Sequence, residues 1–152
     1  MDAVTYPEKS VTDFINTNVI PLRIPSGSEP LATEFRIKWT PTLIILDAEG
    51  REHFRTVGFI TAEGFAPTFL LGTALTHFGL DRFPETLAAL EQIIAGYPKS
   101  NIAAEAVFWR GVAGYKASHD PKPLRKAYDT LAAEYPGSEW ANRALPYRLI
   151  PL

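Results

Sequence analysis

Hydrophobic and polar residues follow two different patterns along the 152-residue chain, and the change occurs near residue 61. Before this point, short apolar runs are separated by segments rich in proline, glycine and serine, which is typical of strands and short helices joined by loops. After it, apolar residues recur about every 3.6 positions and no strand pattern returns. The pattern predicts an α/β part followed by an all-α part.

Two short helices are expected in the first part. Val11, Phe14 and Ile15 fall on one face of a helix, and Ser10 before them is a candidate N-cap. A second helix is expected at residues 30–37, because a proline suits a first helical position and apolar residues follow on one side. Both helices are therefore predicted to be amphipathic.

Three strands are expected between and after these helices. Residues 19–24 form a β-branched run interrupted by a proline, which strands tolerate mainly at an edge or a bulge. Residues 43–46 are continuously apolar and residues 53–57 alternate, so these two predict a hairpin with a buried strand and a strand nearer an edge. We interpret the polar residues between them as turn formers rather than paired catalytic carboxylates: Asp47, Glu49 and Gly50.

The second part is predicted to consist of five helices, with Thr61 or Thr68 capping the first. They are expected at about 61–79, 82–96, 101–117, 121–134 and 138–143. A Tyr-Pro-x-Ser motif at 97–100 recurs at 135–138, 38 positions later. Proline cannot continue a helix and serine can cap the next one, so the recurrence predicts repeated helix pairs.

Composition narrows the possible partners. The chain is 46% hydrophobic and carries 15 basic against 17 acidic residues, a formal charge of -2, so we expect a globular protein that does not bind nucleic acid. The longest near-apolar run, residues 65–75, is about half of the roughly 20 residues that a membrane span needs. The N-terminus has neither the basic nor the apolar region of a secretory signal, so a cytoplasmic protein without membrane association is expected.

The candidate chemistry is sparse. The chain has no cysteine, which excludes disulfides, thiolate zinc sites and cysteine catalysis. The three histidines, His53, His77 and His119, are scattered without metal-ligand spacing, so no metal is expected. No phosphate-cradling glycine loop and no nucleophile elbow around a serine is present, so no cofactor and no serine catalysis are expected.

Several motifs in residues 3 to about 77 carry a resemblance to a known family. They are Thr5-Tyr6-Pro7, the runs at 19–24 and 43–46, Thr40-Pro41-Thr42-Leu43, Asp47-Ala48-Glu49-Gly50 and Val57-Gly58-Phe59. Together they resemble the C-terminal two thirds of a thioredoxin-like domain, as found in bacterial thioredoxin-related proteins. In that family the proline after the threonine is in cis and its loop meets extended peptides. The resemblance therefore implies Thr40 and Pro41 as peptide-binding residues.

The part of the family that carries its chemistry has no counterpart in this sequence. The Cys-x-x-Cys helix, and the strand, helix and second strand before it, precede the matched region in the family. The second of those strands lies there between the strands that correspond to 19–24 and 43–46, so both would have an unpaired edge. We expect either direct pairing of these two segments or a second copy of the chain, and hence a homo-oligomer.

The helical part resembles tetratricopeptide-type helix pairs over residues 72–136, although the 38-residue offset exceeds the roughly 34 of that repeat. Such repeats bind peptides or other domains through a groove. The candidate groove residues here are Trp109, Arg110 and Tyr115. The resemblances predict a truncated thioredoxin-like domain at 1–78 and a tetratricopeptide-like helical repeat region at 79–152.

Two function hypotheses follow. The first is a non-catalytic protein- or peptide-binding module with an incomplete thioredoxin-like α/β sheet followed by tetratricopeptide-like helix pairs. The alternative is the C-terminal part of a bacterial thiol-disulfide oxidoreductase whose Cys-x-x-Cys lies upstream of Met1. A small-molecule binder is a third possibility that no polar constellation in the sequence supports.

Overall fold

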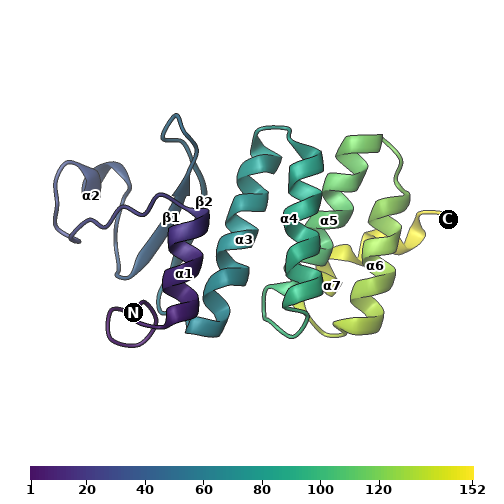
Figure 1. Ribbon diagram of the computed structural model, residues 1–152. Helices are drawn as coiled ribbons and strands as arrows, with labels where there is room; N and C mark the ends of the chain where they lie inside the picture. The colour runs from purple at the N-terminus through teal and green to yellow at the C-terminus, as the bar shows by residue number, and fades with distance from the viewer. The chain divides into compact units, whose positions relative to one another are not determined.

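The structure is a computed structural model that describes residues 1–152 (Figure 1). Its elements in chain order are α1 (Lys9–Asn18), α2 (Leu31–Glu34), β1 (Thr42–Leu46), β2 (Glu52–Val57), α3 (Ala62–Gly79), α4 (Phe83–Gly96), α5 (Ala103–Ser118), α6 (Lys122–Glu134), α7 (Glu139–Ala144) and the 3₁₀ helix η1 (Leu145–Leu149). A two-stranded sheet with short helices is followed by helices alone. The predicted α/β part and all-α part are confirmed.

The chain divides into two compact units, which are described separately. The first unit is Met1–Ala66 and the second is Pro67–Leu152, so the division falls within α3. It comes earlier in the chain than the predicted domain boundary after residue 78. The predicted boundary marks where one family resemblance ends and the other begins, whereas the observed division separates compact units. The predicted boundary therefore stays a prediction.

The first unit has a small core beneath α1. Val11 and Phe65 are buried, and the ring of Phe14 meets the ring of Phe65 edge-on with centroids 6.3 Å apart. Thr5 is also buried, and its hydroxyl donates to the carbonyl of Ile60 at 2.6 Å, which satisfies a polar group that burial would otherwise penalise. The predicted apolar face of the first helix is thus confirmed.

Two details of the predicted short helices are wrong. Ser10 lies inside α1, whose N-cap is Glu8 and has no side-chain capping bond. The second helix ends at Glu34 instead of continuing to residue 37. Arg36 has a positive φ of 52°, and the N–H of Ile37 donates back to the carbonyl of Ala32, which is the hydrogen bond of a helix C-terminus.

The strand predicted at 19–24 does not form. The segment is irregular, Ile20 is 99% exposed and Leu22 is 81% exposed, and the sheet contains β1 and β2 alone. A strand exists only while its N–H and C=O groups pair with a neighbour, and no strand lies alongside this segment. The expected direct pairing of 19–24 with 43–46 is therefore wrong.

The predicted hairpin is confirmed. β1 pairs with β2 in antiparallel register from Thr42 opposite Val57 to Leu46 opposite Glu52, with an irregularity between Ile45 and Leu46. Because Ile45 lies opposite Phe54 and Leu46 opposite Glu52, the intervening His53 is an extra residue in β2. β1 is half-buried from Thr42 to Ile45 and exposed at Leu46, so it is not covered on both faces as expected.

The predicted helices of the second part are all present, and their starts differ in how they are capped. The hydroxyl of Thr61 accepts from the N–H of Gly64 at 3.1 Å at the start of α3. Ser138 caps α7 by accepting from the N–H of Ala141 at 3.0 Å. Ser100 does not cap α5 as expected, because Ile102 is the N-cap and the Ser100 hydroxyl is buried without a hydrogen bond.

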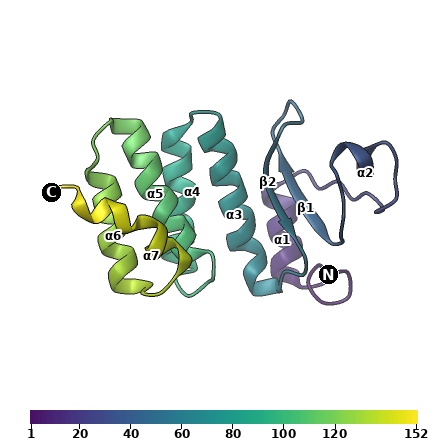
Figure 2. The same cartoon turned by 180° about the vertical axis from the view of Figure 1, so that it is seen from behind.

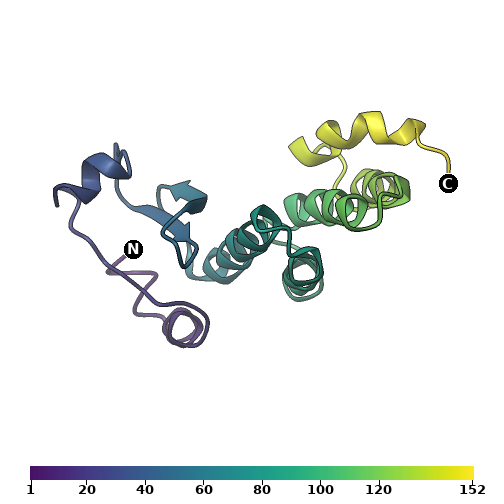
Figure 3. The ribbon, with the colours of Figure 1, turned by 90° about the horizontal axis from the view of Figure 1, so that it is seen from above.

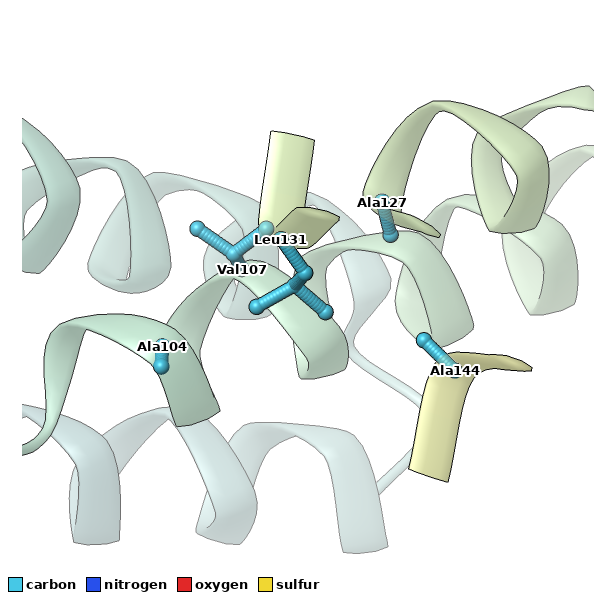
Figure 4. Close-up of a cluster of buried hydrophobic side chains, with 5 residues drawn as sticks. All are labelled: Ala104, Val107, Ala127, Leu131 and Ala144. Atoms are coloured by element: carbon cyan, nitrogen blue, oxygen red, sulfur yellow. The ribbon is translucent and has the colours of Figure 1, made fainter. Parts of the chain in front are cut away.

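Within the second unit, α4, α5 and α6 lie side by side (Figure 1), and α7 with η1 lies across α5 and α6 (Figure 2). Figure 3 shows from above that α7 lies on one side of α5 and α6. The core between α5, α6 and α7 consists of five buried side chains whose small size allows the helices to approach closely (Figure 4). They are Ala104, Val107, Ala127, Leu131 and Ala144.

Candidate functional site

The proline loop precedes β1 and is open to solvent. The Thr40–Pro41 peptide bond is cis, Thr40 is exposed and Trp39 is 71% exposed. The hydroxyl of Thr42 donates to the carbonyl of Trp39 at 2.6 Å, and the N–H of Gly58 donates to the carbonyl of Pro41 at 2.8 Å. These two bonds fasten the loop to the hairpin. The backbone N–H and C=O of Thr40 between them form no hydrogen bond within the chain.

The bond from Gly58 to Pro41 determines which backbone groups of β1 face away from β2. Residues opposite each other in an antiparallel ladder alternate between hydrogen-bonded and non-hydrogen-bonded pairs. Since Pro41 and Gly58 form a hydrogen-bonded pair, Leu43 and Ile45 bond to β2, and the N–H and C=O groups of Thr42 and Ile44 point outward. We call this row of backbone groups the outer edge of β1.

Nothing in the chain pairs with the outer edge of β1. The sheet consists of β1 and β2 (Figure 2). No backbone hydrogen bond outside the ladder involves Thr42 or Ile44. The exposed Trp39 and the unpaired backbone of Thr40 lie directly before it in the chain. An extended polypeptide can add to such an edge through main-chain hydrogen bonds, whatever its sequence.

The turn at the other end of β1 is organised by the carboxylate of Asp47. One oxygen accepts from the N–H groups of Glu49 and Arg51 at 3.0 and 2.8 Å. The other accepts from Arg51 Nε at 2.8 Å and lies 2.8 Å from His53 Nε2, which therefore carries the proton. The bond from His53, and then those from Arg51, hold the pKa of Asp47 well below its usual value, against the effect of desolvation. The interpretation of Asp47 as a turn former agrees with this geometry.

We expect Asp47→Asn, which keeps the shape and removes the charge, to destabilise the hairpin at neutral pH. A depressed pKa means that the carboxylate stabilises the folded state above the unfolded pKa of about 4, and that this stabilisation is lost as the pH falls through the lower folded pKa. The difference in the free energy of unfolding between wild type and variant should therefore become smaller below about pH 4. Urea unfolding followed by the NMR signals of β1 and β2 measures it.

Glu49→Gln is the matched control in the same turn. The carboxylate of Glu49 lies 3.4 Å from Arg51 with 67% of its side chain exposed, and exposed ion pairs contribute little. Its unfolding midpoint should follow that of the wild type at every pH. Equal pH dependence of wild type and Asp47→Asn would contradict the assigned role.

The structure places the three predicted groove residues on α5 without bringing them onto one surface. Trp109 is half-buried, and its ring meets that of Phe78 at 5.3 Å. Arg110 Nη1 donates to Glu91 Oε1 on α4 at 3.1 Å. Tyr115 is 40% exposed further along the helix. Neighbouring helical positions point about 100° apart, which explains this divergence. Their role in binding stays a prediction.

A series of ring contacts connects five elements of the second unit (α3, α4, α5, α7 and η1), and all its members are half-buried. Phe78 contacts Phe83 and Trp109, and Trp109 contacts Phe108. The ring centroid of Phe108 lies 5.1 Å from that of Trp140 and 5.9 Å from that of Tyr147. We call this set the aromatic row: Phe78, Phe83, Phe108, Trp109, Trp140 and Tyr147.

An acidic side chain lies against the aromatic row. Trp109 Nε1 donates to Glu105 Oε1 at 3.3 Å, one helical turn away on α5. Burial raises the pKa of the Glu105 carboxyl, and the nearby charge of Glu139 raises it further, while the bond from Trp109 and the charge of Arg143 lower it. Sequence reasoning missed Glu105, although its i, i+4 spacing from Trp109 was visible.

The structure has neither a metal-binding cluster nor a membrane-spanning helix. No group of three or more histidine, aspartate and glutamate side chains is placed so that it could hold a metal ion. None of the helices has the length and apolar character required to cross a membrane.

Comparison with known proteins gives one match. No curated protein and no solved structure matches the chain. Residues 3–71 match the family model described as a thioredoxin-like domain. This range includes α1, the proline loop and the hairpin, and it ends within α3. The matched residues with their two-stranded sheet fit an incomplete thioredoxin-like fold, and an all-α part follows them.

Proposed function

We propose that this thioredoxin-like protein is a binding module for polypeptides that does not itself exchange thiols. The observation that carries the proposal is the unpaired outer edge of β1, with the free backbone of Thr40 beside it. Thiol exchange needs a sulfur nucleophile, and none of the 152 residues is cysteine. Main-chain pairing needs no side-chain chemistry, so it fits a domain without catalytic groups.

The composition of β1 supports this use. Sheet edges that avoid association usually carry charged side chains or proline. The five residues of β1 are Thr, Leu, Ile, Ile and Leu, without a charge. The exposed indole of Trp39 adds an apolar contact beside the edge. The edge therefore carries none of the side chains that usually prevent pairing.

We also propose that the helices of the second unit are tetratricopeptide-like pairs. Support comes from the 38-residue recurrence of the Tyr-Pro-x-Ser motif, which in both copies follows a helix, α4 and then α6. Close packing at Gly111, where α5 meets α6, is also consistent with such pairs. A helical array of this kind would provide a second surface for protein partners.

The peptide-binding proposal is tested with a defined extended probe, the peptide acetyl-Thr-Val-Thr-Val-Thr-amide. At millimolar peptide we expect the N–H groups of Thr42 and Ile44 to become protected from hydrogen exchange. Those of Leu43 and Ile45 should not change, because they already bond to β2. Hydrogen exchange measured by NMR resolves these alternate residues.

Two variants at one position control the experiment. Ile44→Pro removes the outward N–H without removing a bond to β2, and Ile44→Ala shortens the side chain but keeps that N–H. We expect protection of Thr42 to be lost in the proline variant and kept in the alanine variant. Protection that does not alternate along β1 would contradict the proposal.

The same edge can pair with a second copy of the chain, and we propose a homo-oligomer on this ground. Light scattering at micromolar concentration should then give a mass above the 16.9 kDa of one chain. Ile44→Pro should shift the mass toward the monomer. A wild-type mass near 17 kDa would contradict self-association and leave the edge to other polypeptides.

A second candidate function is that of the C-terminal part of a thiol-disulfide oxidoreductase. The exposed apolar residues Ile20 and Leu22 favour it, because they lie in the same compact unit as the unpaired edge of β1. A strand supplied from elsewhere in a longer protein could then pair with both segments. In that case residues 19–24 should gain protection together with Thr42 and Ile44, whereas edge pairing alone protects β1.

A further inference from the structure

We propose that Glu105 and the aromatic row form a docking surface for an arginine or lysine side chain of a protein partner. The inference rests on the proposal that the chain binds polypeptides, but it concerns the second unit and not the outer edge of β1. It therefore adds a chemical preference for basic segments to a surface of the helices.

The carboxylate of Glu105 lacks a cationic hydrogen-bond partner. Its hydrogen bond comes from the neutral indole of Trp109, at 3.3 Å. Its side chain is half-buried, which removes part of the solvation of the charge and raises the pKa of the carboxyl. A cation placed against this carboxylate would replace the solvation that it has lost.

The charges around Glu105 do not balance. Glu139 and Arg143 of α7 are its charged neighbours. Arg143 is engaged by Glu139, to which its Nε donates at 3.0 Å. Two carboxylates and one guanidinium leave a formal charge of -1 beside the aromatic row. One additional positive charge would neutralise the cluster.

The chain itself shows that this surface accepts a guanidinium. The guanidinium carbon of Arg143 lies 4.7 Å from the centre of the Trp140 ring. Trp109 donates its indole N–H to Glu105. Its side chain is half-buried, so part of its surface is exposed. A second cation can thus bind by ring contact and charge together, as Arg143 does beside Trp140 and Glu139.

The neighbouring rings specify what should flank the cation. Phe78 and Phe108 both contact Trp109, with ring centroids 5.3 and 6.0 Å from that of Trp109. They offer apolar surface and no charge. The fitting partner is therefore a segment in which arginine or lysine stands next to an apolar residue. The excess negative charge disfavours phosphate-bearing ligands at the same place.

The experiment compares two dipeptides of nearly equal shape, of which only the first is charged: acetyl-Leu-Arg-amide and acetyl-Leu-citrulline-amide. We expect the arginine peptide to shift the NMR signal of the Trp109 indole N–H, the group that donates to Glu105. The citrulline peptide should bind at least tenfold more weakly. Glu105→Gln should lower the affinity for the arginine peptide to that of the wild type for the citrulline peptide.

Glu134→Gln is the matched control variant, because Glu134 is exposed on α6 and has the same charge. It should bind the arginine peptide as the wild type does. The inference is overturned if the arginine peptide causes no shift at millimolar concentration, or if both peptides cause equal shifts in the wild type. The signals of Thr42 and Ile44 should stay unchanged throughout, so failure here is distinguishable from failure of edge pairing.

Discussion

Leu131→Ala should destabilise the second unit by about 2–5 kcal/mol, the range typical of such truncations in a packed core. Leu131 is fully buried on α6 and is the largest side chain of the core in Figure 4. The other buried members of this cluster are three alanines and Val107, and larger half-buried side chains such as Phe108 and Trp140 pack around it. Truncation removes apolar contacts on several sides and leaves a cavity that close-packed neighbours fill only in part.

Urea unfolding followed by far-ultraviolet circular dichroism measures this change, since the signal comes mainly from the helices. Leu149→Ala is the control, because it removes the same atoms from a side chain that is 79% exposed. Its midpoint should stay within about 0.5 kcal/mol of the wild type, as is usual for surface substitutions. Equal effects of the two substitutions would show that Leu131 is not in a closed core.

Gly111→Ala is the second large effect that we expect. A Cβ at this position of α5 would lie 2.5 Å from the Cβ of Ala127 and 3.0 Å from the carbonyl oxygen of Pro123, both on α6. Backbone cannot move aside as a flexible side chain can. The two helices must separate, and overpacking of this kind costs about 1–3 kcal/mol or more.

Gly96→Ala is the matched control on α4. A Cβ there would meet nothing within 4 Å, and the residue ends a helix. Alanine is favoured over glycine in helices by roughly 0.5–1 kcal/mol, so this variant should be as stable as the wild type or slightly more. The urea midpoint should fall for Gly111→Ala and stay unchanged or rise slightly for Gly96→Ala. A tolerated alanine at residue 111 would contradict the close contact of α5 with α6.

The helices were predictable because their determinants are local. A 3.6-residue period, a proline and a capping hydroxyl lie within a few positions of each other. The two Tyr-Pro-x-Ser motifs nevertheless differ in outcome. Gly137 adopts a left-handed φ of 81° and leads Ser138 into its capping conformation, whereas Lys99 occupies the corresponding position before Ser100. A β-carbon disfavours the left-handed region, so the first motif continues through a turn to Ile102.

The strand at 19–24 could not be predicted correctly because its determinant is not local. Its alternating apolar residues have strand propensity, but a strand needs a partner, and the sequence pattern does not say whether one is at hand. The hairpin was predictable for the opposite reason. Its two strands are joined by a turn that Asp47 organises, so each is the partner of the other.

The candidate sites also combine features that the local sequence predicts with features that depend on tertiary contacts. Thr40 and Pro41 were found through a motif, but the outward direction of Thr42 and Ile44 depends on the pairing register. Glu105 and Trp109 are four residues apart on one helix. The rings of Phe78 and Trp140 reach them through tertiary packing, which no spacing within the sequence records.

The extra residue at His53 has a consequence for how the hairpin can vary in length. Side chains and backbone groups of a strand alternate in direction, so a shift of one residue exchanges the two sides. The N–H of Asp47 donates to the carbonyl of Arg51, so Asp47 lies in the same inward row of β1 as Ile45 and Leu43, on both sides of the bulge. The extra residue therefore changes the sides of β2 alone: without it, His53 and Arg55 would take the inward positions of Phe54 and Thr56. A residue gained or lost in β2 at this point should leave the outward amides of Thr42 and Ile44 unchanged.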